Sequence, residues 1–464
     1  MSKFQLLFCV ICIFTFICVI ESSWNVTINH NPNCNLSKEC DKYDVIYING
    51  RNLTSSVHVF ITASERFSFP SVLIVHSSSA EVDPVIDWDK LNASSGKRLS
   101  LKNVTQSYAL VFYKMVEYND LSDNVNMSNY PKNSDQIRSH YFNEFQWKRN
   151  PINDTSSLTF ENNLFEITYN GTKPNMTSSY EQVIIKFRIS NTTQHDQSMP
   201  HLLFTPGRIV QFDVLFNNLT SHFNQSRFGL QLLLMSNLTL QPNEEFRREI
   251  LFNIDDELTP GNFEMINFLL GESVSKLTNN NPNDDNQYLS NSTHPSAFLQ
   301  IKPSCFIDDQ VRTVQNSRNV YIGQHQDLFM NYDEHESGNL SQSHLLNYSF
   351  PSIFYADRLN ASHDQAIGLR LLNLSFGTSM DGFYEKTKFI VWTASFGLGN
   401  PPTDNLSSLL ISLIIFSMLI IISSIIVGII LVIVLRRRST TTTNTTSHPD
   451  RQPILSHFVN DPIS

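Results

Sequence analysis

The clearest structural signal in the chain is a pair of segments, VIIKFRI at residues 183–189 and IVQFDVLF at residues 209–216. Over residues 185–189 and 210–214 apolar residues alternate with polar ones, which gives an extended chain one apolar and one polar face. This alternation is typical of half-buried β-strands. The two segments therefore predict strands that pack their Phe, Ile and Val side chains into a core.

The same pattern extends along most of the chain. Short β-branched or aromatic runs recur between Asn, Ser, Gly and Pro residues, as at 72–75, 108–116, 230–235 and 389–392. Strands at this spacing predict an all-β, β-sandwich-like domain. We expect a short helix only over residues 264–270. A possible internal boundary lies near residue 241, and two modules or one continuous domain both fit the sequence.

The N-terminus has the pattern of a secretory signal peptide. Lys3 precedes an apolar run over residues 4–20, and Ser22 and Ser23 provide small side chains for cleavage. We therefore predict a signal peptide over residues 1–23. An uncleaved anchor is the alternative.

A second apolar segment predicts a membrane-spanning helix. Residues 409–435 carry no charge, and Arg436-Arg437-Arg438 follow directly. About 20 apolar residues span a bilayer, and the arginines place the C-terminus in the cytosol. The chain is therefore predicted to be a type I single-pass membrane protein. Its lumenal domain covers residues 24–405, its transmembrane helix 406–435 and its cytosolic tail 436–464.

The lumenal part is rich in acceptor sites for N-glycosylation. Among the 47 Asn of the chain, 19 begin Asn-X-Ser/Thr sequons before the membrane span, whereas chance gives roughly eight in the whole chain. Asn405 lies too close to the membrane for glycosylation. The predicted sites are Asn25, Asn35, Asn52, Asn92, Asn103, Asn126, Asn153, Asn170, Asn175, Asn191, Asn218, Asn224, Asn237, Asn291, Asn339, Asn347, Asn360 and Asn373.

Charge and composition exclude some classes of function. The net charge of −10 and the lack of a long basic stretch exclude a nucleic-acid partner. The 33 Phe and 15 Tyr exclude a mainly disordered chain. The lumenal part has 28 basic and 40 acidic residues beside twelve His. We expect these histidines to become charged in an acidic organelle.

Cysteine and motif content argue against a metal site and an enzyme. Of the lumenal cysteines, Cys34 and Cys40 could close a small loop, which leaves Cys305 reduced or bonded to another chain. No catalytic motif of the common hydrolases, metalloproteases or nucleotide-binding folds is present. In the cluster Asp255-Asp256-Glu257, adjacent side chains of an extended chain point to opposite faces, so an exposed turn explains it better than paired catalytic carboxylates. We predict no enzymatic activity and no cofactor.

The cytosolic tail contains a pattern that resembles an acidic dileucine sorting signal. Asp450 lies four positions before the aliphatic pair Ile454-Leu455. Clathrin adaptors bind such a pair in an apolar pocket and the carboxylate on a basic patch. Asp450, Ile454 and Leu455 therefore predict a clathrin adaptor as partner and delivery to endosomes or lysosomes. A chance occurrence is the alternative.

An ordered series of short segments runs through the lumenal domain and up to the membrane. Its members are Ser107–Phe112 with Glu117–Asp120, Phe145–Trp147, Arg227–Leu230, Asn253–Pro260, Asn373–Gly377, Trp392, Gly397–Gly399 and Pro401–Asp404. The series resembles the glycosylated lysosomal membrane protein family.

The resemblance implies a lysosomal protein whose lumenal domain covers a polytopic membrane partner. In that family the partner is a major-facilitator-type transporter that handles dipeptides, and the glycoprotein protects it from lysosomal proteases. The membrane segment has small or polar positions for packing against a partner helix, or these positions face lipid. They are Ser412, Ser417, Ser423, Ser424 and Gly428. The alternative from another class is a cell-surface adhesion or receptor glycoprotein with a β-sandwich ectodomain.

Two features depart from the family pattern. The family sorts by a tyrosine-based signal at the C-terminus, and this tail contains no Tyr. Asp450 with Ile454-Leu455 replaces it, or the destination differs. The lumenal cysteines of the family are mostly missing, and only Cys305 has a counterpart, so the family's disulfide pattern does not transfer.

Overall fold

The three-dimensional structure is a computed structural model with two separate units, residues 1–404 and 405–464. It describes residues 24–34, 39–91, 98–123, 125, 135–150, 159–173, 182–236, 247–254, 262–270, 297–308, 311–322, 326–327, 349–359, 368–377, 388–402 and 408–441. The predicted signal peptide lies outside these residues.

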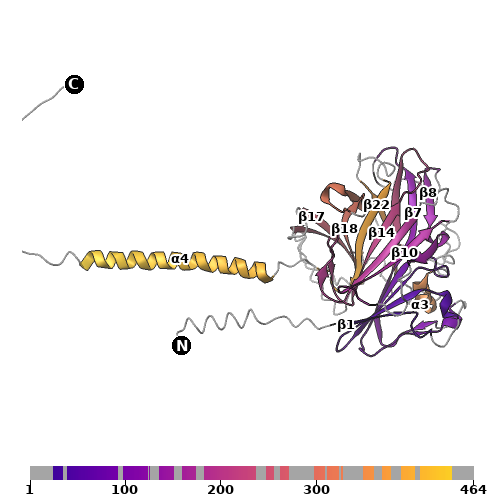
Figure 1. Ribbon diagram of the computed structural model, residues 1–464, viewed down its shortest axis with the longest axis horizontal. Helices are drawn as coiled ribbons and strands as arrows, with labels where there is room; N and C mark the ends of the chain where they lie inside the picture. Colours follow the sequence, from indigo (N-terminus) through magenta and orange to yellow (C-terminus); the bar gives the residue numbers. More distant parts are fainter. Residues whose placement is uncertain are drawn as a thin grey trace, which may run out of the picture. The chain divides into compact units, whose positions relative to one another are not determined.

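The described part of the first unit is dominated by one antiparallel β-sheet, which curls into two facing layers (Figure 1). The prediction of an all-β, sandwich-like domain is thereby confirmed. One layer follows the order β1-β2-β3-β4-β7-β15-β21, with β8 beside β7 and with β19 and β20 beside β21. Its strands are β1 (Asn25–His30), β2 (Val45–Arg51), β3 (Ser56–Thr62), β4 (Ser71–Ser77), β7 (Val104–Asn119), β8 (Ile137–Tyr141), β15 (Ser226–Ser236), β19 (Ser317–Ile322), β20 (Gln326–Asp327) and β21 (Gly368–Phe376).

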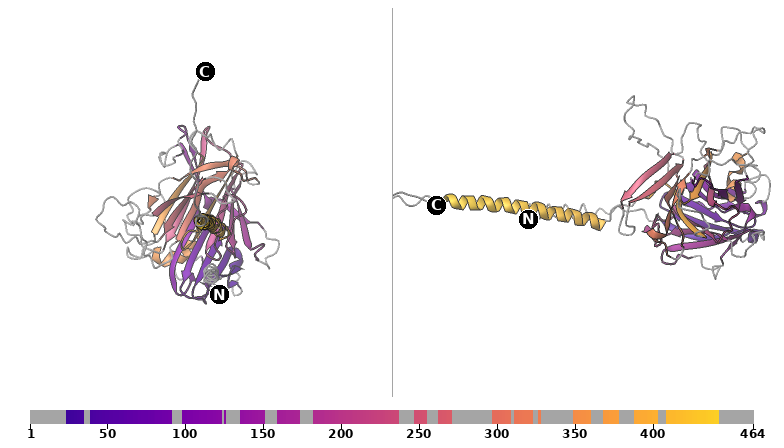
Figure 2. Two further views of the ribbon diagram at one scale, coloured as in Figure 1. Left: turned by 90° about the vertical axis from the view of Figure 1, so that its left-hand side faces the viewer. Right: turned by 90° about the horizontal axis from the view of Figure 1, so that it is seen from above.

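The second layer follows the order β9-β10-β11-β14-β22-β18-β17-β16. Figure 2 gives two further views of the ribbon diagram. The layers join where β18 pairs with β19. The strands are β9 (Gln146–Arg149), β10 (Leu164–Thr172), β11 (Gln182–Ser190), β14 (Ile209–Asn217), β16 (Arg247–Ile254), β17 (Asn262–Leu270), β18 (Ala297–Phe306) and β22 (Phe389–Leu398).

Shorter elements decorate the two layers. They are the strand pairs β5 (Val85–Ile86) with β6 (Leu99–Ser100) and β12 (Gln194–His195) with β13 (Leu203–Phe204), the helix α3 (Phe350–Leu359), and the 3₁₀ turns η2 (Cys40–Lys42), η3 (Trp88–Lys90), η5 (Phe142–Glu144) and η6 (Val314–Asn316).

The core lies between the layers and consists of the apolar faces that the alternation predicted. Phe112 of β7 contacts Phe187 of β11 and Phe212 of β14, with ring centroids 5.8 and 5.0 Å apart. Phe216 of β14 likewise packs against Phe376 of β21 at 5.5 Å. The apolar positions of β11 and β14 therefore face the opposite layer.

The expected helix over residues 264–270 is wrong, because this segment belongs to strand β17. It pairs with β16 on one side and with β18 on the other, and residues 265–270 are buried. A short apolar run that is buried on both faces lacks the alternation of a half-exposed strand, so its sequence does not separate a strand from a helix. Strands on both sides of residue 241 also pair directly, as β14 does with β22.

A charged contact links the layers on the side away from the β18–β19 junction. Asp44, directly before β2, accepts a hydrogen bond from His30 Nε2 of β1 at 2.9 Å. Its other carboxylate oxygen lies 3.1 Å from Arg149 Nε of β9 in the second layer. The edge strands β1 and β9 are thus connected through one carboxylate.

The second unit contains the helix α4 (Ser408–Thr441). Among the described residues, this is the one helix long and apolar enough to cross a membrane, over Leu413–Arg438 with a mean hydropathy of 3.3. These 26 residues rise by about 39 Å, which exceeds the hydrocarbon core of a bilayer. The hydroxyls of Ser417, Ser423 and Ser424 donate to carbonyls three residues earlier, so they are compatible with lipid.

Candidate functional site

A long loop covers the outer face of the second layer. This loop, residues 191–204, is called the strap below and includes β12 and β13. Arg188 of β11 contacts Asp196 at 2.5 Å and Ser198 at 3.1 Å. Further side chains donate to strap carbonyls, namely Gln211 to Leu202 (3.0 Å), Lys302 to Pro200 (2.6 Å) and Arg312 to Met199 (3.2 Å).

The strap lies over a buried carboxylate that binds two arginines. Asp213 of β14 is 1% exposed and accepts from Arg188 Nη2 at 2.5 Å and Arg312 Nη2 at 2.8 Å. Thr393 Oγ1 of β22 donates to it at 2.7 Å. Burial alone would raise the pKa of Asp213, but the two guanidinium groups and these hydrogen bonds hold it below its usual value. The carboxylate is therefore charged at neutral and mildly acidic pH.

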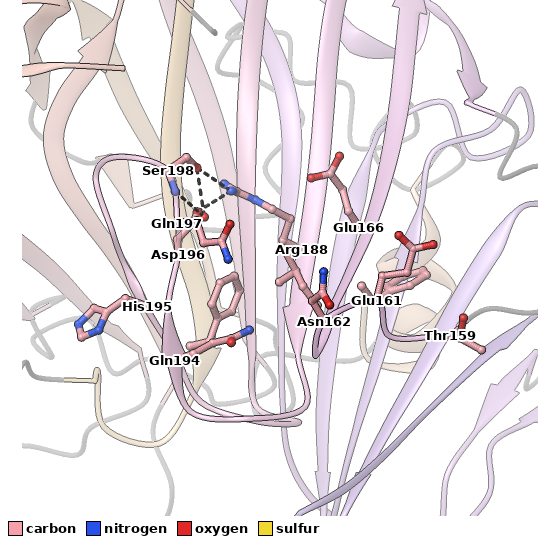
Figure 3. A pocket seen from close by; sticks show the side chains of 13 residues that line it. Thr159, Glu161, Asn162, Glu166, Arg188, Gln194, His195, Asp196, Gln197 and Ser198 are labelled. Carbon is pink, nitrogen blue, oxygen red and sulfur yellow. Dashed lines mark hydrogen bonds and ion pairs between the residues drawn. The ribbon is translucent and has the colours of Figure 1, made fainter. Parts of the chain in front are cut away.

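A pocket of about 750 Å³ opens between the strap and the turn before β10 (Figure 3). Ten of its thirteen lining residues are polar. The lining residues are Thr159, Glu161, Asn162, Leu164, Phe165, Glu166, Arg188, Gln194, His195, Asp196, Gln197, Ser198 and Phe204. Figure 3 shows the Arg188 guanidinium directed at Asp196 and Ser198, with Glu161 and Glu166 on its other side.

The geometry of this pocket fits binding rather than acyl transfer. Ser198 Oγ donates to Asp196 Oδ1 at 3.1 Å, and His195 points away from Ser198 in Figure 3. The carboxylate of Asp196 is engaged in an ion pair with Arg188. The described lining therefore offers hydrogen-bonding groups without an activated nucleophile.

A second buried charge cluster joins three segments of the series found in the sequence. Arg227 is 2% exposed and Asp120 is fully buried, with Arg227 Nε 2.7 Å from Asp120 Oδ2. Arg227 also pairs with Asp123 and donates to the Phe376 carbonyl at 3.0 Å. Residues that lie 107 and 149 positions apart in the chain thus meet at one guanidinium. Their role is to hold β7, β15 and β21 together.

Glu117, Ser226 and His140 lie close together but do not form a catalytic triad. Ser226 Oγ and the His222 amide both donate to Glu117 Oε1 at 2.5 Å, and His140 Nε2 lies 3.9 Å from Oε2. Burial raises the pKa of Glu117, yet the nearby His140 and the hydrogen bonds from Ser226 and the His222 amide outweigh this effect and lower it. Ser226 is fully buried and donates to a carboxylate instead of a histidine, so it is not a nucleophile.

The expectation that the lumenal histidines become charged is wrong for His58. This side chain is fully buried, and its two ring nitrogens contact Tyr47 Oη at 2.8 Å and Ser56 Oγ at 2.9 Å. Burial, helped by the charge of Arg51, lowers the pKa of His58 to about 4. Burial also lowers the pKa of His76. His58 therefore stays mostly neutral at a pH near 5.

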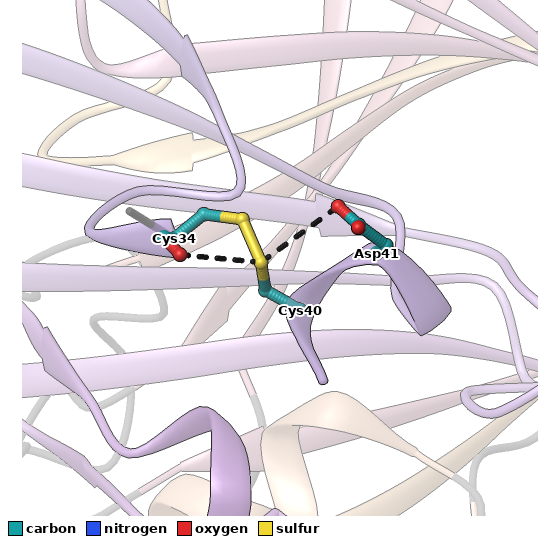
Figure 4. A group of neighbouring side chains, drawn as sticks. All are labelled: Cys34, Cys40 and Asp41. Carbon is teal, nitrogen blue, oxygen red and sulfur yellow. Dashed lines mark hydrogen bonds between the residues drawn. A yellow bond between two sulfur atoms is a disulfide. The ribbon is translucent and has the colours of Figure 1, made fainter. Parts of the chain in front are cut away.

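Cys34 and Cys40 form the disulfide that the sequence allowed (Figure 4). The bond closes a short loop between β1 and β2. Among the described His, Cys, Asp and Glu side chains, Cys34, Cys40 and Asp41 form the group that lies close enough together to hold a metal ion. The two sulfurs are bonded to each other, so they are not metal ligands. Cys305 is 1% exposed on β18, and this burial disfavours a bond to another chain.

The predicted glycosylation sites differ in accessibility. In the described part of the chain, Asn25, Asn103, Asn218 and Asn224 are exposed, Asn52, Asn170 and Asn191 are partly exposed, and Asn373 is buried. Several other predictions lie outside the described residues. They are Asn35, Asn92, Asn126, Asn153, Asn175, Asn237, Asn291, Asn339, Asn347, Asn360, the cluster Asp255–Glu257, and the tail residues Asp450, Ile454 and Leu455.

Asn373 is expected to carry no glycan in the folded protein. It is 7% exposed within β21, and its Oδ1 accepts a hydrogen bond from Gln231 Nε2 at 2.7 Å. A sugar on Asn373 would have to enter the sheet surface between β15 and β21. Glycopeptide mass spectrometry of the purified protein should find Asn373 unmodified and Asn218 modified. A glycan on Asn373 in folded protein would contradict the burial of this side chain.

Sequence patterns did not identify the charge clusters as sites. Arg188 and Asp213 occupy the polar positions of alternating strands, where solvent exposure is the usual outcome. The available signal was their opposite charge on two segments that were both predicted to be strands. The partners of Asp213 lie 25, 99 and 180 residues away, and no local pattern links such positions.

Comparison with known proteins shows similarity over most of the chain. The sequence profile of the glycosylated lysosomal membrane protein family matches residues 44–439. Glycosylated lysosomal membrane proteins A and B of Xenopus laevis are 25% and 24% identical over 412 and 415 residues, covering 85% of this chain in both cases and 85% and 86% of their own lengths. The glycosylated lysosomal membrane protein of Danio rerio is 25% identical over 350 residues, or 74% of this chain and 73% of its own.

Proposed function

The chain belongs to the glycosylated lysosomal membrane protein family, and on this premise we propose that it is a non-enzymatic accessory subunit of a lysosomal transporter. It is a single-pass, type I glycoprotein of the lysosomal membrane, with a large N-terminal domain and one C-terminal membrane-spanning helix. The proposed partner is a major-facilitator-type transporter for dipeptides, which the lumenal domain protects against proteolysis.

The observation that carries this proposal is that buried polar groups connect distant segments of the lumenal domain. Asp213, Arg227 and Glu117 each connect strands or loops that are distant in the sequence. Proteases cut segments that unfold locally, and strands joined in a continuous sheet open only at a high free-energy cost. A rigid, glycosylated sheet is therefore well suited to survive among lysosomal proteases and to shield loops of a neighbour.

The helix α4 supports a partner within the membrane. Ser417, Ser424 and Gly428 lie at intervals of seven and four residues, so they fall on one face of the helix. Small side chains on one face allow close approach of another helix.

Loss of the chain should destabilise its partner. In cells without it, we expect the abundance of one lysosomal major-facilitator-type transporter to fall several-fold while its mRNA stays constant, because the unshielded protein is degraded. Quantitative proteomics of purified lysosomes measures this change, and an inhibitor of lysosomal proteases should reverse it. Re-expression of Gly428→Leu should restore less transporter than the matched variant Ile429→Leu. Unchanged levels of all such transporters would contradict the accessory role.

The sorting role of the tail is tested separately. With Leu455→Ala, we expect part of the protein to move from lysosomes to the cell surface, because an adaptor loses half of the aliphatic pair. Surface biotinylation measures the shift, and Val459→Ala in the same tail serves as the matched control. Lysosomal localisation that is unaffected by Leu455→Ala would reject Asp450, Ile454 and Leu455 as the signal without affecting the accessory role. Mainly surface localisation of the unmodified protein would favour a receptor.

A further inference from the structure

The sequon Asn191-Thr192-Thr193 forms the start of the strap and lies at the rim of the pocket. The backbone amide of Asn191 donates to the Asn163 carbonyl at 3.1 Å, and Asn163 lies between the lining residues Asn162 and Leu164. Three residues further along, Gln194 lines the pocket and donates through Nε2 to Ser190 Oγ at 3.0 Å. Both flanks of Asn191 are therefore fixed to elements that form the pocket.

We propose that this pocket is a cradle for the N-linked glycan of Asn191. The first sugars of this glycan start at the rim, so the covalent link keeps them at a high effective concentration beside the pocket. Contacts that would be too weak to hold a dissolved oligosaccharide then suffice to hold a tethered one.

The lining has the chemistry that a neutral oligosaccharide requires. Sugar hydroxyls donate and accept hydrogen bonds, and the amides of Asn162, Gln194 and Gln197 do the same. The carboxylates of Glu161 and Glu166 accept from hydroxyls. The guanidinium of Arg188 is already bound by Asp196 and Asp213, so this cation is engaged within the protein.

The volume of the pocket and the apolar part of its lining also fit several sugar residues. Its volume of about 750 Å³ lies within the range of pockets that enclose small molecules. Leu164, Phe165 and Phe204 make up the apolar part of the lining. The exposed sequons Asn103, Asn218 and Asn224 do not line this pocket, which makes them internal controls.

The test is site-resolved digestion of the native glycoprotein. Full-length protein with high-mannose glycans, purified in detergent, is treated with an endoglycosidase, and glycopeptide mass spectrometry follows each site with time. We expect release from Asn191 to be about tenfold slower than release from Asn218, which corresponds to about 1.4 kcal/mol of protection. After denaturation the two rates should be equal.

Variants of the lining connect the protection to the pocket. Glu161 and Gln197 are exposed, so Glu161→Ala with Gln197→Ala should leave the fold intact. This double variant should bring the release rate at Asn191 to that at Asn218, while Glu65→Ala, at an exposed position outside the pocket, should leave both rates unchanged. Three results would each overturn the proposal. They are equal release rates at Asn191 and Asn218 in the native unmodified protein, slow release at Asn191 that persists in the double variant, and the absence of a glycan from Asn191. None of these outcomes depends on the transporter partner.

Discussion

Replacing Asp213 by Ala should cost the lumenal domain about 3–5 kcal/mol of stability, because one partner of a buried ionic network is removed. Arg188 and Arg312 would remain beneath the strap without the carboxylate that both contact. Thr393 would lose the acceptor of its hydroxyl. Thermal unfolding of the full-length protein in detergent measures the effect as a large fall in Tm.

Two further variants separate the charge of Asp213 from its volume. Asp213→Asn keeps the size of the side chain and an acceptor for Thr393, so its Tm should lie between those of the wild type and Asp213→Ala. Glu65→Ala removes an exposed carboxylate and should change the stability by less than about 0.5 kcal/mol. An unchanged Tm in Asp213→Ala would show that the arginines do not depend on this carboxylate.

The stabilisation by Asp213 should persist at lysosomal acidity. Its pKa in the folded protein is lower than the usual value, which is about 3.9 in an unfolded chain. A carboxyl group of this kind stabilises the folded state fully above the unfolded pKa and loses this contribution as the pH falls through the folded pKa. The Tm difference between the wild type and Asp213→Asn should therefore be equal at pH 7 and pH 5 and shrink below about pH 4.

Replacing Arg227 by Met should have a comparable effect on the other layer, again about 3–5 kcal/mol. Met fills part of the space of Arg227 but leaves the fully buried Asp120 without its cation. The Phe376 carbonyl also loses its donor, which weakens the connection to the end of β21. Urea unfolding of the full-length protein, monitored by tryptophan fluorescence, measures the loss.

A second substitution tests whether the lost charge pair is the cause. In Arg227→Met with Asp120→Asn no charge of this pair remains buried, so part of the stability should return. The side-chain amide introduced at position 120 would retain an oxygen that accepts the Val125 amide, as Asp120 Oδ2 does at 3.1 Å. A double variant no more stable than Arg227→Met alone would assign the loss to packing instead.

The candidate site was visible in the sequence only in part. The sequon at Asn191 follows directly from three residues, since Asn-X-Ser/Thr is a local pattern. The pocket beside it does not, because Glu161, Arg188 and Gln197 meet only after β10, β11 and the strap have folded together. The same limit applies to Asn373, whose sequon resembles the others although pairing with β15 buries its side chain.

The sequence by itself determined the all-β fold class, the orientation in the membrane and the membrane helix of this protein. A strand repeats every two residues and a membrane span needs about 20 apolar residues, so both leave local patterns, as in residues 210–214 and 409–435. Only the tertiary structure decided whether the polar side chains of those strands are solvated or buried. Arg188 and Asp213 are buried instead of solvated because the strap and Arg312 close over them. A charged side chain can be buried only where groups of opposite charge and hydrogen-bonding groups surround it, and here those groups come from distant parts of the chain.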